Sequence, residues 1–221
     1  MAEPEFHLGA PALVCRWRLA GRSVPLLNRH MRALSQRRVN GEPLSTNLLS
    51  WVKQHIEWSL AEDPAVAADG VLMIVVDENG QAAMSTGAYQ ALEDASLEGL
   101  TRRASLAQAE AAERDVAPEV LCAAVDGGIV LGISEGSSTA GSVSLVKQLA
   151  ETRGLNVSYD PALSFRALSG IFDGKAFLVS DEHGVVAAVN AEGAKERAAD
   201  ERSETVAFLA ASFEKLFDSV R

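Results

Sequence analysis

The sequence predicts an α+β fold of two lobes, and three features of its 221 residues support this prediction. Pairs of apolar runs flank the turn sequences DENG, DGG and DEHG, which is typical of β-hairpins. Longer segments with apolar residues at helical spacing lie between these hairpins. A polar connection, EDASLEGLTR, precedes a shift to alanine-rich composition. We therefore expect a small α+β lobe at 1–95 and a larger α/β lobe at 96–221.

The first lobe is expected to begin with a hairpin and two helices. Residues 11–27, PALVCRWRLAGRSVPLL, predict a β-hairpin around AGRS, and 28–39 predict a helix capped by Asn28. Residues 44–63 predict a second helix, which is capped by Ser45, Thr46 or Asn47. One stripe of apolar residues on this helix is expected to pack inward, and its aromatic side chains are also expected in the core. The stripe consists of Leu48, Val52, Ile56 and Leu60, and the aromatic residues are Trp51 and Trp58.

The second lobe is expected to alternate strands and helices. The pattern predicts an alanine-rich helix at 102–115, a hairpin at 119–134, a helix at 142–153 that stops at Gly154, a strand, a short helix after Pro161, paired strands around DEHG, and a final helix within 195–220.

Composition excludes several classes of protein. A net charge of -10 argues against a nucleic-acid binder, because such proteins hold the phosphate backbone with Lys and Arg. No apolar run approaches the ~20 residues that span a bilayer, and the acidic start MAEPEFHLGA differs from a secretory signal. We expect a cytoplasmic protein that binds no membrane. Cys15 and Cys122 are expected as buried, reduced thiols.

The first forty residues are basic although the chain is acidic. They hold seven arginines against Glu3 and Glu5. This excess suits an anionic ligand or an acidic neighbouring surface, and it also suits a solvated helix face that balances charge within the protein. The arginines are Arg16, Arg18, Arg22, Arg29, Arg32, Arg37 and Arg38.

A hydroxyl-rich loop, SEGSSTAG at 134–141, lies directly before the helix at 142–153. The free N–H groups of a helix start favour an anion, although serine and threonine also cap helices that bind nothing. The loop lacks a P-loop or dinucleotide motif, no G-x-S-x-G elbow is present, and no two histidines have metal-ligand spacing. We expect no metal site, and among the histidines His183, in the DEHG turn, is the one to watch.

Four segments in order resemble the class IV aminotransferases, the fold-type IV pyridoxal-phosphate (PLP) family that includes aminodeoxychorismate lyase and the D-amino acid and branched-chain aminotransferases. The segments are PLLNRHMRAL, EVLCAAVDGGIVLGISEGSSTA, SVSLVKQLAETRGLNVSYDPALSFRAL and KAFLVSDEHGVVAAV. The resemblance implies the two-lobed fold of these enzymes, with a second lobe shortened where EGSSTAG runs straight into a helix.

The resemblance also places residues of a cofactor site. The lysine that forms the Schiff base matches Arg102, or Thr101 by a slip of one, and arginine is no nucleophile. The glutamate that pairs with the pyridine nitrogen matches Glu135. Two phosphate-binding residues of the family are replaced in this chain. The family arginine matches Leu26, four residues before His30, and the small hydroxyl residue of the late strand matches Asp181. Further expected cofactor contacts are Ser137, Ser138 and Thr139.

The departures from the pattern set the functional expectation. The leading hypothesis is a class IV aminotransferase homologue that has lost lysine-dependent chemistry and binds a small anionic metabolite, with PLP not held covalently. An active aminotransferase or aminodeoxychorismate lyase, using a lysine such as Lys147 or Lys175, is the alternative. A non-catalytic dimeric scaffold is the third hypothesis, because the resemblance implies a homodimer.

Overall fold

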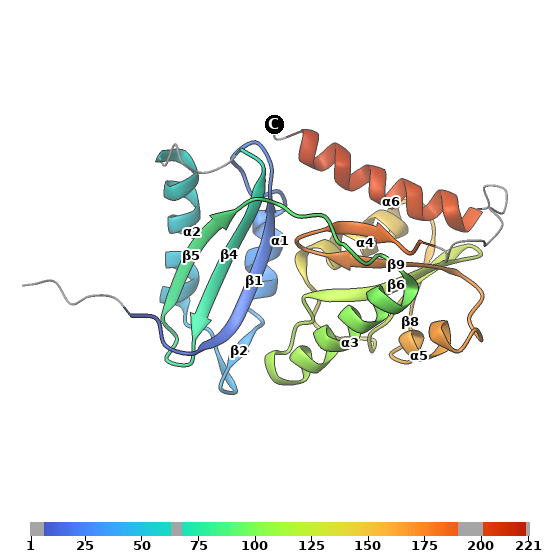
Figure 1. Cartoon of the computed structure of the whole chain (residues 1–221), viewed down its shortest axis with the longest axis horizontal. Coiled ribbons are helices and arrows are strands. Elements are labelled where there is room, and N and C mark those ends of the chain that lie inside the picture. The colour runs from blue at the N-terminus through green and yellow to red at the C-terminus, as the bar shows by residue number, and fades with distance from the viewer. Residues whose placement is uncertain (1–6, 63–67, 190–200, 220–221) are drawn as a thin grey trace, which may run out of the picture.

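The fold contains two main β-sheets, an antiparallel sheet from the first half of the chain and a mixed sheet from the second half (Figure 1). It is known from a computed structural model, which describes residues 7–62, 68–189 and 201–219. The first sheet lies within residues 11–87 and the second within 119–187, and the segment 88–96 connects the two halves. This arrangement is the two-lobed α+β architecture that the sequence predicts, while the exact domain boundary at 95 stays a prediction.

The small lobe is a three-stranded antiparallel sheet in the order β1-β4-β5, with two helices against one face (Figure 1). Apolar side chains of β1, β4 and both helices share one core cluster, which explains why these segments assemble. A two-stranded ribbon, β2 and β3, lies between the helices in sequence. The elements are β1 (Pro11–Leu19), α1 (Leu27–Leu34), β2 (Arg38–Val39), β3 (Glu42–Pro43), α2 (Thr46–Glu62), β4 (Gly70–Asp77) and β5 (Ala82–Gly87).

The hairpin expected at 11–27 is wrong. Gly21 and Arg22 take positive φ angles of 54° and 58°, and only the isolated bridge from Ala20 to Ser23 follows β1. The strand pairs instead with β4, because β4 offers a long apolar partner. The cap expected at Asn28 is also wrong, since the N-cap position is Leu26, in the left-handed region at φ 64°.

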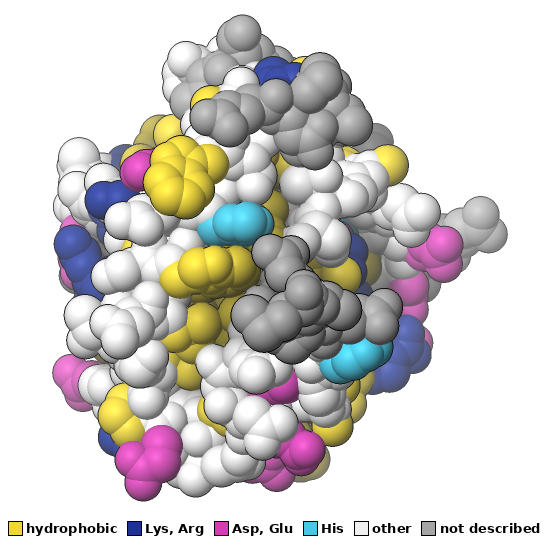
Figure 2. Space-filling view, turned by 90° about the vertical axis from the view of Figure 1, so that its left-hand side faces the viewer, with side chains coloured by type: hydrophobic (Ala, Val, Ile, Leu, Met, Phe, Trp, Pro, Cys, Tyr) yellow, Lys and Arg dark blue, Asp and Glu magenta, His cyan; other side chains and the backbone are white. Residues whose placement is uncertain are grey.

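Helix α2 is confirmed, but its tryptophans are not in the core. The Ser45 hydroxyl accepts a hydrogen bond from the Leu48 N–H at 3.2 Å, as expected of a cap. Ile56 faces the core, and at about 100° per residue the two tryptophans fall on the other side of the helix. Trp51 is 36% and Trp58 61% exposed. Figure 2 shows hydrophobic side chains at the surface of this side of the molecule.

The large lobe is a five-stranded mixed sheet in the order β10-β9-β6-β7-β8. Only the β7 and β8 pair is parallel, and α4 makes the crossover between them, as parallel neighbours require. The elements are α3 (Leu97–Arg114), β6 (Glu119–Val125), β7 (Gly128–Leu131), α4 (Gly141–Thr152), β8 (Asn156–Tyr159), α5 (Leu163–Leu168), β9 (Lys175–Ser180), β10 (Gly184–Ala187) and α6 (Glu201–Asp218).

Helices cover both faces of this sheet, which explains the nearly continuous apolar runs of its central strands. On β6, Cys122 belongs to the core cluster shared with α4 and α6, whereas Leu121 belongs to the cluster shared with α3 and α5. Helix α3 begins earlier than expected, because the Ser96 hydroxyl caps it by accepting the Gly99 N–H at 3.1 Å. In the described part of the chain, no helix combines the length and apolarity needed to cross a membrane.

The shortening of the second lobe is visible between β7 and α4. Within the described residues 132–140 there is no strand, only an isolated bridge from Thr139 to Ala117. The chain therefore passes from the hairpin into α4 through the short loop that the sequence predicts. This route brings the start of α4 against the small lobe, since α4 contacts α1.

Candidate functional site

A cavity of about 320 Å³ lies where the two lobes meet. The small lobe contributes β1 and α1, and the large lobe contributes α3, the start of β6 and the turn between β9 and β10. Its walls combine apolar groups with an unusual number of charges. The lining residues are Val14, Cys15, Arg16, Trp17, His30, Ala33, Leu34, Arg37, Arg103, Leu106, Ala107, Glu110, Pro118, Glu119, Ser180, Asp181 and Glu182.

The basic segment at the start of the chain faces acids of the second lobe. Arg37 Nη1 lies 2.7 Å from Glu110, and Arg38 Nε lies 2.5 Å from Asp115. Arg16 makes a third pair of this kind, described below. For these three arginines the structure shows charge balance within the protein, which is one of the two roles that the sequence left open.

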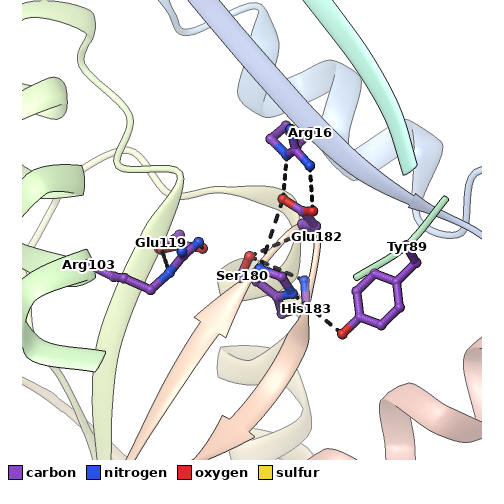
Figure 3. Close-up of polar contacts among 7 residues, drawn as sticks. All are labelled: Arg16, Tyr89, Arg103, Glu119, Ser180, Glu182 and His183. Carbon is purple, nitrogen blue, oxygen red and sulfur yellow. Dashed lines mark hydrogen bonds and ion pairs between the residues drawn. The ribbon is translucent and has the colours of Figure 1, made fainter. Parts of the chain in front are cut away.

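Two arginines of the cavity are held by glutamates in the same bidentate way (Figure 3). Arg16, on β1, donates from Nε and Nη2 to Glu182 at 2.5 and 2.8 Å. Arg103, on α3, donates from Nε and Nη2 to Glu119 at 2.8 and 2.6 Å. Within the described part of the chain, Nη1 of each arginine makes no hydrogen bond. Both guanidinium groups are therefore fixed in orientation with one donor-bearing end left open.

The charge of Glu182 is maintained although this residue is buried. Burial opposes its ionisation, but the hydrogen bonds from Arg16 and the positive charges of Arg16 and Arg103 outweigh burial and lower the pKa. His183 lies 3.4 Å from the Tyr89 hydroxyl, and burial lowers its pKa against the opposing influence of Glu182 (Figure 3). The Ser180 hydroxyl fixes the turn by accepting the N–H groups of Glu182 and His183.

Asp181 joins three elements at the inner end of the cavity. Its Oδ1 accepts a hydrogen bond from the Ser142 N–H at 2.8 Å, in the first turn of α4. Its Oδ2 lies 3.2 Å from Nδ1 of His30, whose ring stacks on Trp17 with centroids 5.0 Å apart. Burial opposes ionisation, yet the His30 and Ser142 contacts outweigh it and lower the pKa of Asp181. The Asp181 carboxylate therefore binds the first turn of α4.

The other residues expected at a cofactor site lie outside the cavity. Arg102 is 68% exposed at its side chain and pairs with Asp94 on the outer side of α3, while the buried Thr101 hydroxyl bonds the Leu97 carbonyl. Glu135 and Ser137 are exposed in the loop before α4. That loop also holds the half-buried Ser138 and Thr139, which do not line the cavity.

Sequence reasoning missed the residues that carry most of the charge here. Arg103, Glu119 and Glu182 attracted no prediction. The helical periodicity of α3 was the available signal. Arg103 and Ala107 are four residues apart and therefore lie on the same face of the helix, which lines the cavity. Leu26, which replaces the expected arginine, packs instead against the core of the large lobe.

Comparisons with known structures identify the fold. The chain resembles a hypothetical aminotransferase from Mycobacterium tuberculosis, with 12% identity, TM-score 0.57, and coverage of 100% of this chain and 94% of that one. It also resembles a protein described as a 4-amino-4-deoxychorismate lyase from Legionella pneumophila, with 11% identity, TM-score 0.57 and 96% of each chain covered.

A branched-chain amino acid aminotransferase from Thermobaculum terrenum matches with 14% identity, TM-score 0.56, and coverage of 98% of this chain and 89% of that one. The PLP-bound form of the Mycobacterium tuberculosis protein matches as well, with 10% identity and TM-score 0.56 over 99% of this chain and 94% of that one. No family model matches the sequence, and no curated protein is significantly similar to it. The chain therefore has the fold of the class IV aminotransferases.

The cavity does not fit PLP as that fold would hold it. No lysine of the described residues lines it. Lys147, on α4, lies over the ring of Tyr159, which is on β8. Lys175 is the first residue of β9, whereas the cavity residue Ser180 is the last. The carboxylate of Asp181 accepts the Ser142 N–H at the start of α4, and a helix start of this kind favours anions. No group of His, Cys, Asp and Glu suited to a metal ion occurs among the residues described.

Proposed function

We propose that this protein binds a small anionic metabolite in the cavity between its lobes and uses no lysine-dependent PLP chemistry. One observation carries the proposal: a cavity without a described lysine presents the open Nη1 ends of Arg16 and Arg103. The class IV fold supports a ligand site at this place, while the residues support a chemistry different from that of the active enzymes.

The guanidinium geometry suggests how an anion would bind. Each glutamate uses the Nε and Nη2 edge of its arginine, so an incoming carboxylate or phosphate can bind the Nη1 end without breaking the ion pair. The apolar wall formed by Trp17 and Leu34 offers a surface to the rest of the ligand. Because an anion at the Nη1 end is attracted by the positive charge of the guanidinium group, affinity should fall as salt concentration rises.

Calorimetric titration with succinate, benzoate and inorganic phosphate tests this proposal. We expect the Arg103→Gln protein to bind the best of these at least about tenfold more weakly, since one charge-assisted contact is lost. The control is Arg166→Gln, which removes a comparable ion pair with Asp160 that lies outside the cavity. Equal losses in both variants, or no binding by the unmodified protein, would refute the anion site.

The alternative of an active aminotransferase or lyase has its own measurement. The protein is mixed with PLP, its absorbance spectrum is recorded, and peptides are mapped by mass after borohydride reduction. We expect neither a visible imine band nor a lysine adduct. A single reduced adduct, on Lys147, Lys175 or another lysine, would establish the enzyme alternative and identify the residue.

A dimeric scaffold is the second candidate, favoured by exposed apolar side chains around α5. Phe165 is 70% and Ile171 69% exposed, which is unusual for large apolar groups that have no partner. Light scattering should report a dimer that Phe165→Glu converts to a monomer. A monomer at every concentration would remove the support for this candidate and for the homodimer expected from the sequence.

A further inference from the structure

We propose that Asp181 is a built-in anion that takes the place of a bound phosphate at the start of α4. The chain would then satisfy its own anion site, which closes this part of the cavity to an external phosphate. The proposal concerns a different part of the cavity from the open ends of Arg16 and Arg103, so it stands or falls separately from the proposed function.

The start of α4 is a helix terminus that needs an acceptor. The helix has twelve residues, and its free N–H groups and dipole favour negative charge. The N-cap position is Ala140, whose side chain offers no hydrogen bond, so the usual local solution is absent. The acceptor comes instead from Asp181, 39 positions away, at 2.8 Å from the Ser142 nitrogen.

His30 supplies a second contact to the same carboxylate. Its side chain is 3% exposed, and Nδ1 lies 3.2 Å from Asp181 Oδ2 but makes no hydrogen bond with any described residue. Gly141 permits this arrangement, because a Cβ atom there would lie 2.5 Å from His30 Nδ1. The helix start and the imidazole are therefore closely packed at Gly141, with the Asp181 carboxylate in contact with both.

These contacts explain why an external phosphate should be excluded. A second anion within about 4 Å of the Asp181 carboxylate is repelled, and this carboxylate already accepts the Ser142 N–H. The family resemblance gives this position a small hydroxyl residue where a phosphate is bound. Replacing Asp181 by serine should accordingly vacate the space and leave the Ser142 N–H and His30 available to a phosphate.

The experiment compares the full chain with its Asp181→Ser variant in the presence of inorganic phosphate, at ionic strength matched with chloride. The Ser142 amide resonance reports binding at the site, and the urea midpoint reports linked stability. We expect phosphate to shift both in Asp181→Ser, with at least about tenfold tighter binding than in the unmodified protein. The control is Asp160→Ser, because Asp160 also accepts a backbone N–H and pairs with an arginine, but lies outside the cavity.

Two further results decide the remaining cases. If Asp181→Ser is unfolded without phosphate, it should refold on phosphate addition and not on addition of chloride. Asp181→Asn fills the same space without charge, and its Ser142 amide should not respond to phosphate, as in the unmodified protein. The proposal is overturned if phosphate shifts the Ser142 amide of the unmodified protein, or if phosphate neither binds nor refolds Asp181→Ser.

Discussion

The hydrogen bond from the Ser142 N–H to Asp181 Oδ1, at 2.8 Å, joins the first turn of α4 to the turn that follows β9. Through the 3.2 Å contact with His30, the same carboxylate ties both elements to α1 in the other lobe. One ionised side chain therefore holds together three segments that are distant in sequence, and its charge state should influence the stability of the whole molecule.

Replacing Asp181 by asparagine should make the protein less sensitive to acid. The folded-state pKa of Asp181 is lowered, so its charge stabilises the fold fully above the unfolded pKa of about 3.9 and loses this effect as pH falls through the folded pKa. Urea unfolding from about pH 7 to about pH 2 should show the unmodified protein more stable at neutral pH, and the difference should shrink in acid. A difference that stays constant over this range would contradict the assignment.

Replacing Gly141 by alanine should destabilise the fold by about 1–3 kcal/mol, because the added Cβ would overlap the buried His30 ring. Gly87→Ala is the matched control, since a Cβ there meets nothing within 4 Å. Its effect should stay within about 0.5 kcal/mol. Chemical denaturation of both variants measures the comparison, and equal costs would mean that α4 and His30 are less closely fitted than described.

Removing Arg16 should cost more than removing Arg166, although their side chains are almost equally exposed at 49% and 47%. Arg16→Gln leaves the carboxylate of Glu182 inside the contact between the lobes without its bidentate partner, which should cost about 1–3 kcal/mol. Arg166→Gln breaks a peripheral pair worth about 0–1 kcal/mol. Thermal unfolding that ranks the two variants in the reverse order would show that the ion pair between the lobes contributes little.

Replacing Trp58 by alanine should change stability by no more than about 0.5 kcal/mol, because this side chain is 61% exposed. Ile56→Ala, two positions earlier on the buried face, should cost about 2–4 kcal/mol. Both are measured by urea unfolding. A large loss for Trp58→Ala would indicate that the tryptophan is covered in solution, for instance by another subunit.

Local sequence pattern predicted the helices and hairpins whose partners are close in sequence, such as α2 with its Ser45 cap and the pair β4 and β5. It failed for β1, whose partner β4 lies beyond two intervening helices, because nothing local distinguishes that pairing from a hairpin with 24–27. The tryptophans of α2 were misplaced because the expectation followed residue type rather than helical phase.

The site was predictable only in part for a similar reason. Asp181 emerged because its type departs from the family pattern, and the structure explains the change by its contact with α4. Arg103 was passed over for its neighbour Arg102, although one step of about 100° separates a cavity residue from an exposed one. The glutamate partners could not be foreseen, since an ion pair between lobes requires the tertiary arrangement.

The single connection at 88–96 has a consequence for how the molecule could be used. In the described part of the chain, everything else that joins the lobes is noncovalent, including the pairs of Arg37 with Glu110 and Arg38 with Asp115. A chain cut in this connection would leave two fragments held together only by the packing of the two lobes and by local ion pairs between them. Added salt would weaken the contribution of those ion pairs to reassembly of the fragments.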